Sequence, residues 1–322
     1  YKRQLLYNHN IIKRIVTMIN QEFNSILELM QAFSDEQSCI NHLEELRWNG
    51  YVISPFDSTS KVYKCKNNRY RCAKTGKYFN VKTGTLFDNT KIPLRKWFLA
   101  IWLITSHKKG ISSVQLAKDI DVTQKSAWFM LQRIRKCFGI ENDNHLDNDV
   151  EIDETYIGGK NKNRHSNKKV EQSQGRSTKD KIPVVGMVER KGKLNAKQVD
   201  NVQCHTLTKE IVQTVKQTAS LHTDEWMGYN GVSKLYKHSI VNHGVGQYVE
   251  GNVYTNTIEG FWSLLKRGLL GIYHSTSKKH LQNYIDEFVF RYNTRHYEES
   301  ERFNLLLSNT EVRTTYKGLV YG

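Results

Sequence analysis

Proline is scarce in this chain of 322 residues: only Pro55, Pro93 and Pro183 occur, and no segment resembles a long Pro-rich linker. Long apolar runs are also missing, and none approaches the length that spans a bilayer. The basic start lacks the apolar stretch and the small-residue cleavage site of a signal peptide. These absences predict an intracellular protein without a membrane partner.

Cysteine is sparse and unevenly placed. The five cysteines are Cys39, Cys65, Cys72, Cys137 and Cys204. An odd number of widely scattered cysteines argues against a disulfide framework. Reduced thiols in a cytosol fit this pattern better.

Acidic residues are too few to balance the basic ones. Lys and Arg total 48 against 32 Asp and Glu, which gives a formal net charge of +16. Such a balance favours a polyanionic partner, although basic charge can also serve solubility alone. No strongly amphipathic basic helix with an aromatic face is evident, so nucleic acid is favoured over an anionic membrane.

The length suggests two or three domains. Residues 1–50 have apolar residues at helical spacing, which predicts an N-terminal helical region. Residues 51–90 alternate and carry turn pairs, which predicts a small basic β-ribbon. Helices return over 91–140. From 148 to 300 the pattern is strand, strand, strand, helix, strand, strand, helix, helix. A basic insertion loop occupies 158–181; it either orders on DNA or is a passive insertion. Residues 301–322 are predicted to be a C-terminal tail.

A helix-turn-helix is predicted within 91–140. Ser112–Ile120 form the first helix, Asp121–Thr123 the turn and Gln124–Lys136 the second helix, which in this motif enters the major groove. The residues expected to face DNA are Gln124, Lys125, Trp128 and Arg133. An ordinary pair of packed helices that binds nothing has the same pattern.

Three carboxylates stand out in the α/β region. Asp153 interrupts an apolar strand, which is unfavourable unless the acid has a partner or a task. Asp224 ends another short strand, and Glu259 begins a helix. Each also has a plain structural reading: a turn residue for Asp153, a cap for Asp224, and a capping box with Asn256 for Glu259.

The helix that begins near residue 256 is amphipathic. Its apolar residues lie on one arc, while Asn256, Glu259, Ser263 and Lys266 lie on the other. A solvated face has the same appearance, but here it follows two strand-borne acids. Three carboxylates from two strands and a helix suit Mg²⁺ or Mn²⁺, which prefer oxygen ligands. Two such ions can activate an attacking oxygen and stabilise the leaving oxygen of a phosphodiester, while Lys266 and Arg267 hold phosphates.

Three stretches resemble one family: EIDETYIGGK (151–160), HTDEWMGYN (222–230) and the long, specific segment 256–295. They resemble the DDE transposases of bacterial insertion sequences related to eukaryotic Merlin elements, with an ISXO2-like transposase domain. The two segments FNVKTGTLFDNTKIPLRKWFLAIWLI and GISSVQLAKDIDVTQKSAWFMLQRIR are also similar to this family. The resemblance covers roughly residues 35–300.

The resemblance implies an α/β fold with a ribonuclease H-like catalytic domain, preceded by a helical, helix-turn-helix DNA-binding region with a small β-ribbon. It assigns Asp153, Asp224 and Glu259 as the metal-binding catalytic triad. Thirty-four residues lie between Asp224 and Glu259, which fits the family. Lys266 matches the family's basic residue after the glutamate, and Asn256 is an auxiliary catalytic residue. Mg²⁺ is the expected cofactor, and Mn²⁺ can replace it.

The β-ribbon departs from the family pattern. Relatives often carry a zinc ribbon with two Cys-x-x-Cys pairs, but here Ser54 and Asp57 stand for the first pair, and Thr75 replaces one cysteine of the second. Cys72 is retained and Cys65 is out of step. Because a four-ligand zinc site needs its ligands, we expect a metal-free ribbon without zinc.

The resemblance predicts a cut-and-paste transposase that binds the terminal inverted repeats and target DNA, with residues 1–140 recognising the ends. Handling two ends implies a homodimer or a higher assembly. Its location would be the bacterial cytoplasm at the nucleoid, or the nucleus for a eukaryotic element. The alternatives are a catalytically silent, transposase-derived DNA-binding regulator and a ribonuclease H-like nuclease that cannot join strands.

Overall fold

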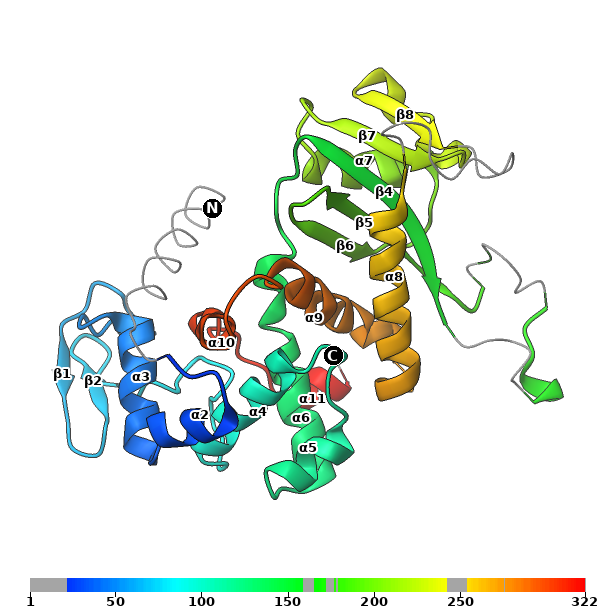
Figure 1. The fold of residues 1–322 in the computed structure, drawn as a ribbon. Coiled ribbons are helices and arrows are strands. Elements are labelled where there is room, and N and C mark those ends of the chain that lie inside the picture. The colour runs from blue at the N-terminus through cyan, green and yellow to red at the C-terminus, as the bar shows by residue number, and fades with distance from the viewer. Residues whose placement is uncertain are drawn as a thin grey trace. The chain divides into compact units, whose positions relative to one another are not determined.

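The chain forms two compact units. The computed structural model describes residues 22–158, 165–171, 177, 179–241, 254–274 and 276–321 (Figure 1). The described residues up to Cys137, together with those from His296 onward, make the first unit. Phe138–Arg295 make the second.

The first unit is mainly helical. Its helices are α2 (Ile26–Ala32), α3 (Glu36–Trp48), α4 (Leu94–Ser106), α5 (Ser113–Asp119), α6 (Gln124–Arg135), α10 (Glu299–Ser308) and α11 (Tyr316–Val320). Asp35 begins α3, where its carboxylate accepts a hydrogen bond from the Ser38 amide at 2.7 Å, satisfying a donor that a helix start leaves open. Pro93 directly precedes α4, at a place where a missing N–H costs nothing.

The C-terminal segment completes the core of the first unit. Phe303 of α10 is fully buried; it makes edge contacts with Phe23 and Phe98 and a tilted ring contact with Phe33. Edge-to-face aromatic pairs add to the free energy gained from burial. Residues 301–322, predicted as a tail, therefore include a helix that packs with the amino-terminal residues.

The predicted β-ribbon is present. Its antiparallel strands are β1 (Val62–Lys64), β2 (Tyr70–Cys72) and β3 (Tyr78–Phe79), in the order β1-β2-β3. Cys72 is buried, and hydrogen bonds from the hydroxyls of Ser54, Ser60 and Thr75 lower the pKa of its thiol to about 6. Hydroxyl groups thus occupy positions near Cys72. Whether the ribbon functions without zinc stays a prediction.

Helices α5 and α6 reproduce the predicted two-helix motif almost residue for residue. Ser112 and Thr123 cap the two helices by accepting hydrogen bonds from the amides of Gln115 and Ser126. Asp121 in the turn has a φ of 49°, a left-handed conformation that Asp tolerates. Two short helices joined by a tight turn are therefore present where the sequence predicted them, and their role in DNA binding stays a prediction.

The second unit is a mixed α/β domain. Its sheet has the order β6-β5-β4-β7-β8, with strands β4 (Asp149–Ile157), β5 (Ile182–Glu189), β6 (Leu194–Gln198), β7 (Ser220–Asp224) and β8 (Lys237–Val241). β4, β5 and β6 are antiparallel neighbours, whereas β7 pairs in parallel with both β4 and β8. The helices are α7 (Cys204–Thr214), α8 (Asn256–Gly268) and α9 (Leu281–Asn293). Shorter helical segments are η1 (Phe138–Glu141), η3 (Ser166–Lys168), η4 (Met227–Tyr229), η5 (Val232–Lys234), η7 (Leu269–Tyr273) and η8 (Lys278–His280).

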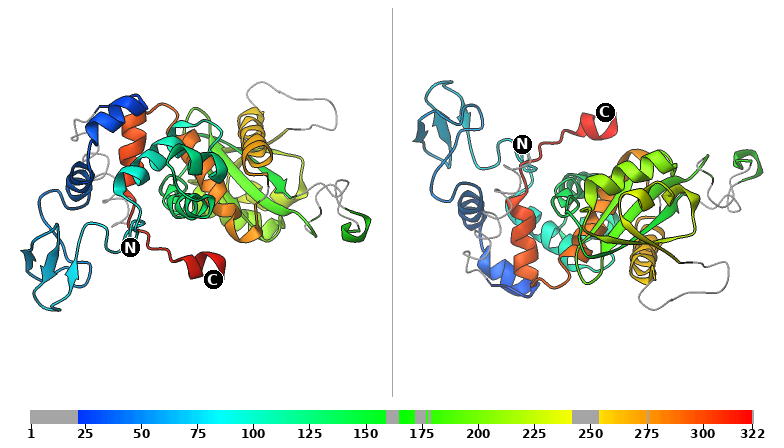
Figure 2. Two further views of the ribbon diagram at one scale, coloured as in Figure 1. Left: turned by 90° about the horizontal axis from the view of Figure 1, so that it is seen from below. Right: turned by 90° about the horizontal axis from the view of Figure 1, so that it is seen from above.

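Alternating residues of the central strands feed two separate cores. Ile152 and Met187 pack with Leu207 and Ile211 of α7 on one face of the sheet. On the other face, neighbouring strand residues pack with α8 and α9, and Figures 1 and 2 show α7 and α8 on opposite sides of the sheet. This alternation follows from the two-residue period of a strand.

One helix differs in extent from its sequence pattern. Residues 205–220 predict a single helix, but α7 ends at Thr214, because Val215 is extended and bridges to Leu146. Half of the basic loop 158–181 lies outside the described residues, as do residues 1–21 of the predicted helical region and the residues that directly follow Val241. None of the helices that the structure describes is long and apolar enough to cross a membrane.

Candidate active site

Asp153 and Asp224 lie on adjacent central strands of the second unit. β4 and β7 pair in parallel, with Glu151 opposite His222. Asp153 and Asp224 are each two residues further along, so the same register places them level. Both acids face the α8 side of the sheet. Asp153 is next to Ile152, and Asp224 is three positions after Leu221, so each acid lies on the opposite face from a residue of the core on the α7 side. The structure therefore brings two of the predicted acids to one place.

The environment of Asp153 opposes its ionised form. Burial raises the pKa of this carboxyl to about 7, with further contributions from the negative charges of Glu154 and Asp224. The indole of Trp262 donates a hydrogen bond to Asp153 Oδ2 at 3.0 Å, which partly offsets the rise and orients the carboxylate toward α8. Two acids that repel each other in a half-buried position favour a bound cation.

Gly186 makes room for this contact. It lies opposite Asp153 on β5, and a Cβ built there would be 2.5 Å from the Trp262 ring and 2.8 Å from Ile258. A separation that short requires something to shift. Glycine at this position therefore allows α8 to lie directly on the strand that carries Asp153.

Glu151 holds the start of α8 on β4. Its carboxylate is fully buried and accepts hydrogen bonds from the backbone amides of Thr257 and Ile258, at 2.8 and 3.1 Å. A carboxylate at a helix N-terminus satisfies free N–H groups and interacts favourably with the helix dipole. Arg190 pairs with Glu151 at 2.9 Å, and its guanidinium also donates to the carbonyl of Tyr254.

Glu151 was not among the residues predicted from the sequence. The available signal was a second acid two positions before Asp153, and therefore on the same face of the strand. Its partners, Arg190 and the amides of α8, are distant in sequence, so only the fold shows its role.

Glu259 lies one turn before Trp262 on α8. It is exposed, and its Oε1 accepts a hydrogen bond from Thr255 at 3.1 Å. The predicted division of α8 is confirmed: Asn256, Glu259 and Lys266 are exposed, whereas the apolar arc is buried. Within the part of the chain that the structure describes, no three His, Cys, Asp or Glu side chains are grouped closely enough to hold a metal ion. The structure thus brings Asp153 and Asp224 together and leaves Glu259 outside a three-ligand group.

The basic residues of α8 lie at its C-terminal end. Lys266 is exposed, and Arg267 is exposed while donating hydrogen bonds to the carbonyl and hydroxyl oxygens of Ser263. Cations at this end interact favourably with the helix dipole. Both side chains are available to a phosphate, which is the role predicted for them.

The helix-turn-helix residues separate into two groups. Gln124 and Lys125 are exposed, and Trp128 is half-buried. Gln124 donates to the hydroxyl of Ser113, which ties the start of α6 to α5. The prediction that Arg133 faces DNA is wrong: only 4% of this residue is exposed. Its guanidinium donates to the carbonyl of Asp88 at 2.9 Å and lies over the rings of Trp97 and Phe129.

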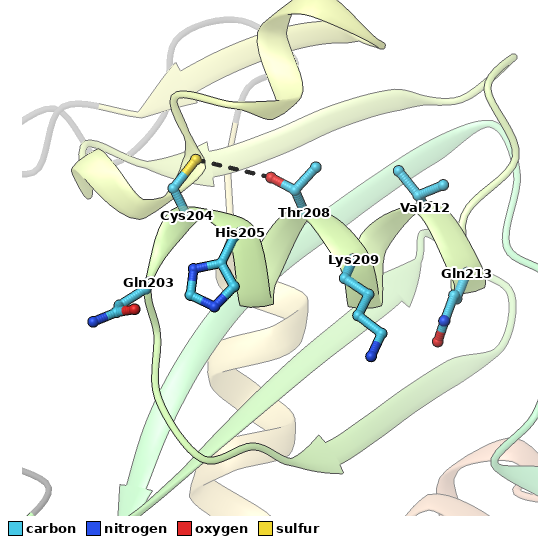
Figure 3. Close-up of a pocket in the computed structure, with 7 residues that line it drawn as sticks. All are labelled: Gln203, Cys204, His205, Thr208, Lys209, Val212 and Gln213. Atoms are coloured by element: carbon cyan, nitrogen blue, oxygen red, sulfur yellow. Dashed lines mark hydrogen bonds between the residues drawn. The ribbon is translucent and has the colours of Figure 1, made fainter.

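A separate hollow of about 860 Å³ lies on α7 (Figure 3). The side chains around it come from Gln203–Gln213 and include no carboxylate. Cys204 and Thr208 contact each other there at 3.9 Å. Because α7 covers the opposite face of the sheet from α8, this hollow is not part of the acidic site.

The second unit is thus a mixed α/β domain with two acids on adjacent central strands, beneath a helix that carries a third acid and two basic residues. Comparison with known proteins shows which family and which relatives this domain and the chain are similar to. Residues 145–293 match the family described as the ISXO2-like transposase domain. The chain is also similar to an uncharacterised protein in transposable element ISH50 of Halobacterium salinarum, with 29% identity over 278 residues, covering 81% of this chain and 92% of that protein.

The family match thus covers most of the second unit, and the relative matched over most of the chain is a protein of a transposable element. Among solved structures, a pre-cleavage Mos1 transpososome is similar to the chain, with 10% identity, coverage of 94% of this chain and 99% of that chain, and a TM-score of 0.25. A score this low establishes no common fold.

Proposed function

We propose that the protein binds the terminal inverted repeats of a DNA transposon and catalyses metal-dependent strand cleavage and strand transfer. The observation that carries this proposal is the placement of Asp153 level with Asp224, on the face covered by the helix of Glu259. The match of this domain to the ISXO2-like transposase family supplies the class of reaction.

A ribonuclease H-like arrangement of the second unit is part of the proposal. The strand order β6-β5-β4-β7-β8 supports it, because three antiparallel strands are followed by two parallel ones and the central strand carries the first acid.

Mg²⁺ or Mn²⁺ fits the donor set. Asp153 and Asp224 offer oxygen ligands, and their mutual repulsion is relieved by a cation. Glu259 is the proposed third ligand, with Asn256 beside it on the same exposed face. When bound, the metal supplies activation of the attacking oxygen and stabilisation of the leaving oxygen.

The remaining residues of the site bind and orient. Trp262 fixes the carboxylate of Asp153 by its N–H donor, and Glu151 fixes the start of α8. Lys266 and Arg267 are placed to hold phosphates of the anionic transition state. In the first unit, the exposed Gln124 and Lys125 at the start of α6 are the proposed contacts to the transposon end, with Trp128 in the following turn.

Strand transfer tests the proposal. The purified protein is incubated with a labelled duplex that carries the transposon end, a plasmid target and Mg²⁺ or Mn²⁺, beside Asp153→Ala, Asp224→Ala and Glu259→Ala. We expect the wild type to join the end to the plasmid, and each variant to bind the end without joining it.

The other outcomes are distinct. If only Glu259→Ala stays active, Asn256 is the better third ligand. If the wild type binds the end but neither cuts nor joins it in either metal, the protein is a silent regulator. Cleavage without joining identifies a nuclease.

A further inference from the structure

The β-ribbon of the first unit has one buried face and one exposed face. Tyr70 and Phe79 are paired across β2 and β3, and both are buried against Trp48 of α3. The neighbouring pairs lie on the other face: Arg71 is opposite Tyr63 on one side and opposite Tyr78 on the other. Tyr63 and Tyr78 are 49% and 51% exposed, so both rings are open to solvent on this face.

The exposed face is basic as well as aromatic. Arg71 is exposed in the middle of the row, and Lys61 and Arg69 are exposed at its margins. The Lys61 ammonium lies 5.4 Å from the centre of the Tyr63 ring, and the Arg69 guanidinium lies 4.8 Å from that of Tyr78. Among the described residues, no carboxylate forms an ion pair with Lys61, Arg69 or Arg71. Lys74 of the same ribbon, by contrast, pairs with Asp57 at 3.3 Å.

The sequence around this face contains no acid. Between Asp57 and Asp88 there are six Lys and two Arg and not one Asp or Glu, so this segment carries half of the chain's net charge of +16. A solvated surface normally mixes both signs, whereas a single-sign surface creates a potential that attracts an opposite polyanion.

We propose that the face formed by Lys61, Tyr63, Arg69, Arg71 and Tyr78 binds the phosphate backbone of duplex DNA. The proposal rests on the proposed function, which makes DNA the partner, and adds a surface outside the helix-turn-helix. Phosphate contacts position a protein on DNA without reading its sequence. The ribbon face therefore contributes affinity for any duplex, and α6 is left to discriminate the transposon end.

The salt dependence of binding tests this surface. The variant Lys61→Gln/Arg71→Gln removes two charges from the face, and Lys64→Gln/Lys77→Gln removes two from the same ribbon but from exposed positions outside the row. Binding of full-length protein to a labelled transposon-end duplex and to an unrelated duplex is followed by fluorescence anisotropy over a range of NaCl concentrations, in EDTA.

For Lys61→Gln/Arg71→Gln we expect the Kd to rise about 10- to 50-fold at about 0.1 M salt, equally for both duplexes, and the slope of log Kd against log salt to fall by about 2. Lys64→Gln/Lys77→Gln should change the slope by less than half as much. Both variants should keep the wild-type Tm because the substituted side chains are exposed.

Three results would contradict the proposal that this face binds the DNA backbone. Equal effects of the two variants mean that only net charge matters. Loss confined to the transposon end means that the face reads sequence. Retained duplex binding with lost binding to phosphatidylserine vesicles means that the face is a membrane surface. EDTA keeps the measurement independent of catalysis, so a failure of strand transfer with this binding pattern intact refutes the reaction and not the surface.

Discussion

Gly186 and Trp262 show how one missing side chain helps to place the carboxylate of Asp153. The indole occupies the space that a Cβ at position 186 would fill, and from there its N–H reaches Asp153. The hydrogen bond from Trp262 to Asp153 thus depends on the close packing of the same indole ring against Gly186. Neither requirement is visible in the sequence, where Gly186 is an ordinary glycine within a strand.

Gly186→Ala should therefore lower both stability and activity. Overpacking of this kind costs about 1 to 3 kcal/mol in the free energy of unfolding, and the displaced indole no longer fixes the carboxylate. Chemical denaturation and the strand-transfer assay measure the two effects. Gly260→Ala is the matched control, because a Cβ there meets nothing within 4 Å. It should stabilise the exposed face of α8 by about 0.5 to 1 kcal/mol. Equal stability of the two variants would contradict the packing argument.

His42 makes the first unit sensitive to acid. Burial lowers the pKa of its imidazole to about 4, against a smaller opposing effect of the hydrogen bond to Asn304. The folded unit keeps His42 neutral, whereas the unfolded chain binds a proton below pH 6.5. The stability conferred by neutral His42 is therefore complete above pH 6.5 and is lost as the pH falls toward 4.

The expected loss is about 2 to 3 kcal/mol. His42→Gln keeps an amide near Asn304 without a titrating group, so its unfolding free energy should fall less between pH 7 and pH 4. Urea titrations of both proteins at several pH values check this. Parallel pH profiles for the two proteins would show that other groups cause the acid sensitivity.

Single residues also mark where sequence patterns stop being informative. The strand positions of Asp153 and Asp224 were predictable, because an acid in or at the end of an apolar strand is conspicuous. Arg133 was misassigned because helical spacing alone cannot tell an exposed arginine from one whose guanidinium reaches the Asp88 carbonyl between two aromatic rings. Glu151 was missed because the amides that it binds are about 100 residues away.

At the scale of elements, α8 is the piece on which the site depends. Its start near residue 256 and its two faces were predicted correctly, and the faces follow from the spacing of its apolar residues. Its attachment to the sheet was not predictable, since it requires Glu151 from one strand, Arg190 just beyond another, and the helix start itself to meet. The early end of α7 has a similar origin, because Val215 takes part in a bridge to Leu146 that competes with further helix.

Glu151→Gln should loosen the start of α8. One acceptor oxygen is replaced by an amide donor, and Arg190 loses its charge partner in a buried position, which costs about 3 to 5 kcal/mol. Strand transfer should fall at least tenfold with binding of the transposon end unchanged. Hydrogen exchange at the Thr257 and Ile258 amides should accelerate, because their carboxylate acceptor is weakened.

Glu189→Gln is the control on the neighbouring strand, where the carboxylate contacts Asn148 rather than a helix. It should leave exchange in α8 unchanged. If exchange at Thr257 and Ile258 is the same in Glu151→Gln and wild type, Glu151 does not hold the helix.

At the scale of the whole molecule, the first unit is assembled from both ends of the chain, whereas Phe138–Arg295 form a continuous second unit. The sequence indicated the order of the regions. It did not show that the C-terminal segment packs with the first unit, because the apolar residues of α10 have the same spacing whether they pack on a distant core or on a local one. Phe303, with its contacts to Phe33 and Phe98, is the clearest sign of the connection.

Removal of residues 296–322 should consequently affect one unit only. The truncated protein loses the side chains of α10 from the aromatic core, and Phe303→Ala alone should cost about 3 to 5 kcal/mol. We expect binding of the transposon end to be lost while residues 138–295 still unfold cooperatively, as followed by hydrogen exchange in the two units. Retained protection in α4 after truncation would contradict this view.

The arrangement also sets the order of events during synthesis. The first unit begins to leave the ribosome before the second, yet Phe303 emerges only after Arg295. Until then Phe33 and Phe98 lack their contacts with Phe303, while the second unit already has its full sequence. The part proposed to hold DNA is therefore finished last, so a nascent chain that stalls before α10 carries the proposed cutting residues without a complete means of finding their substrate.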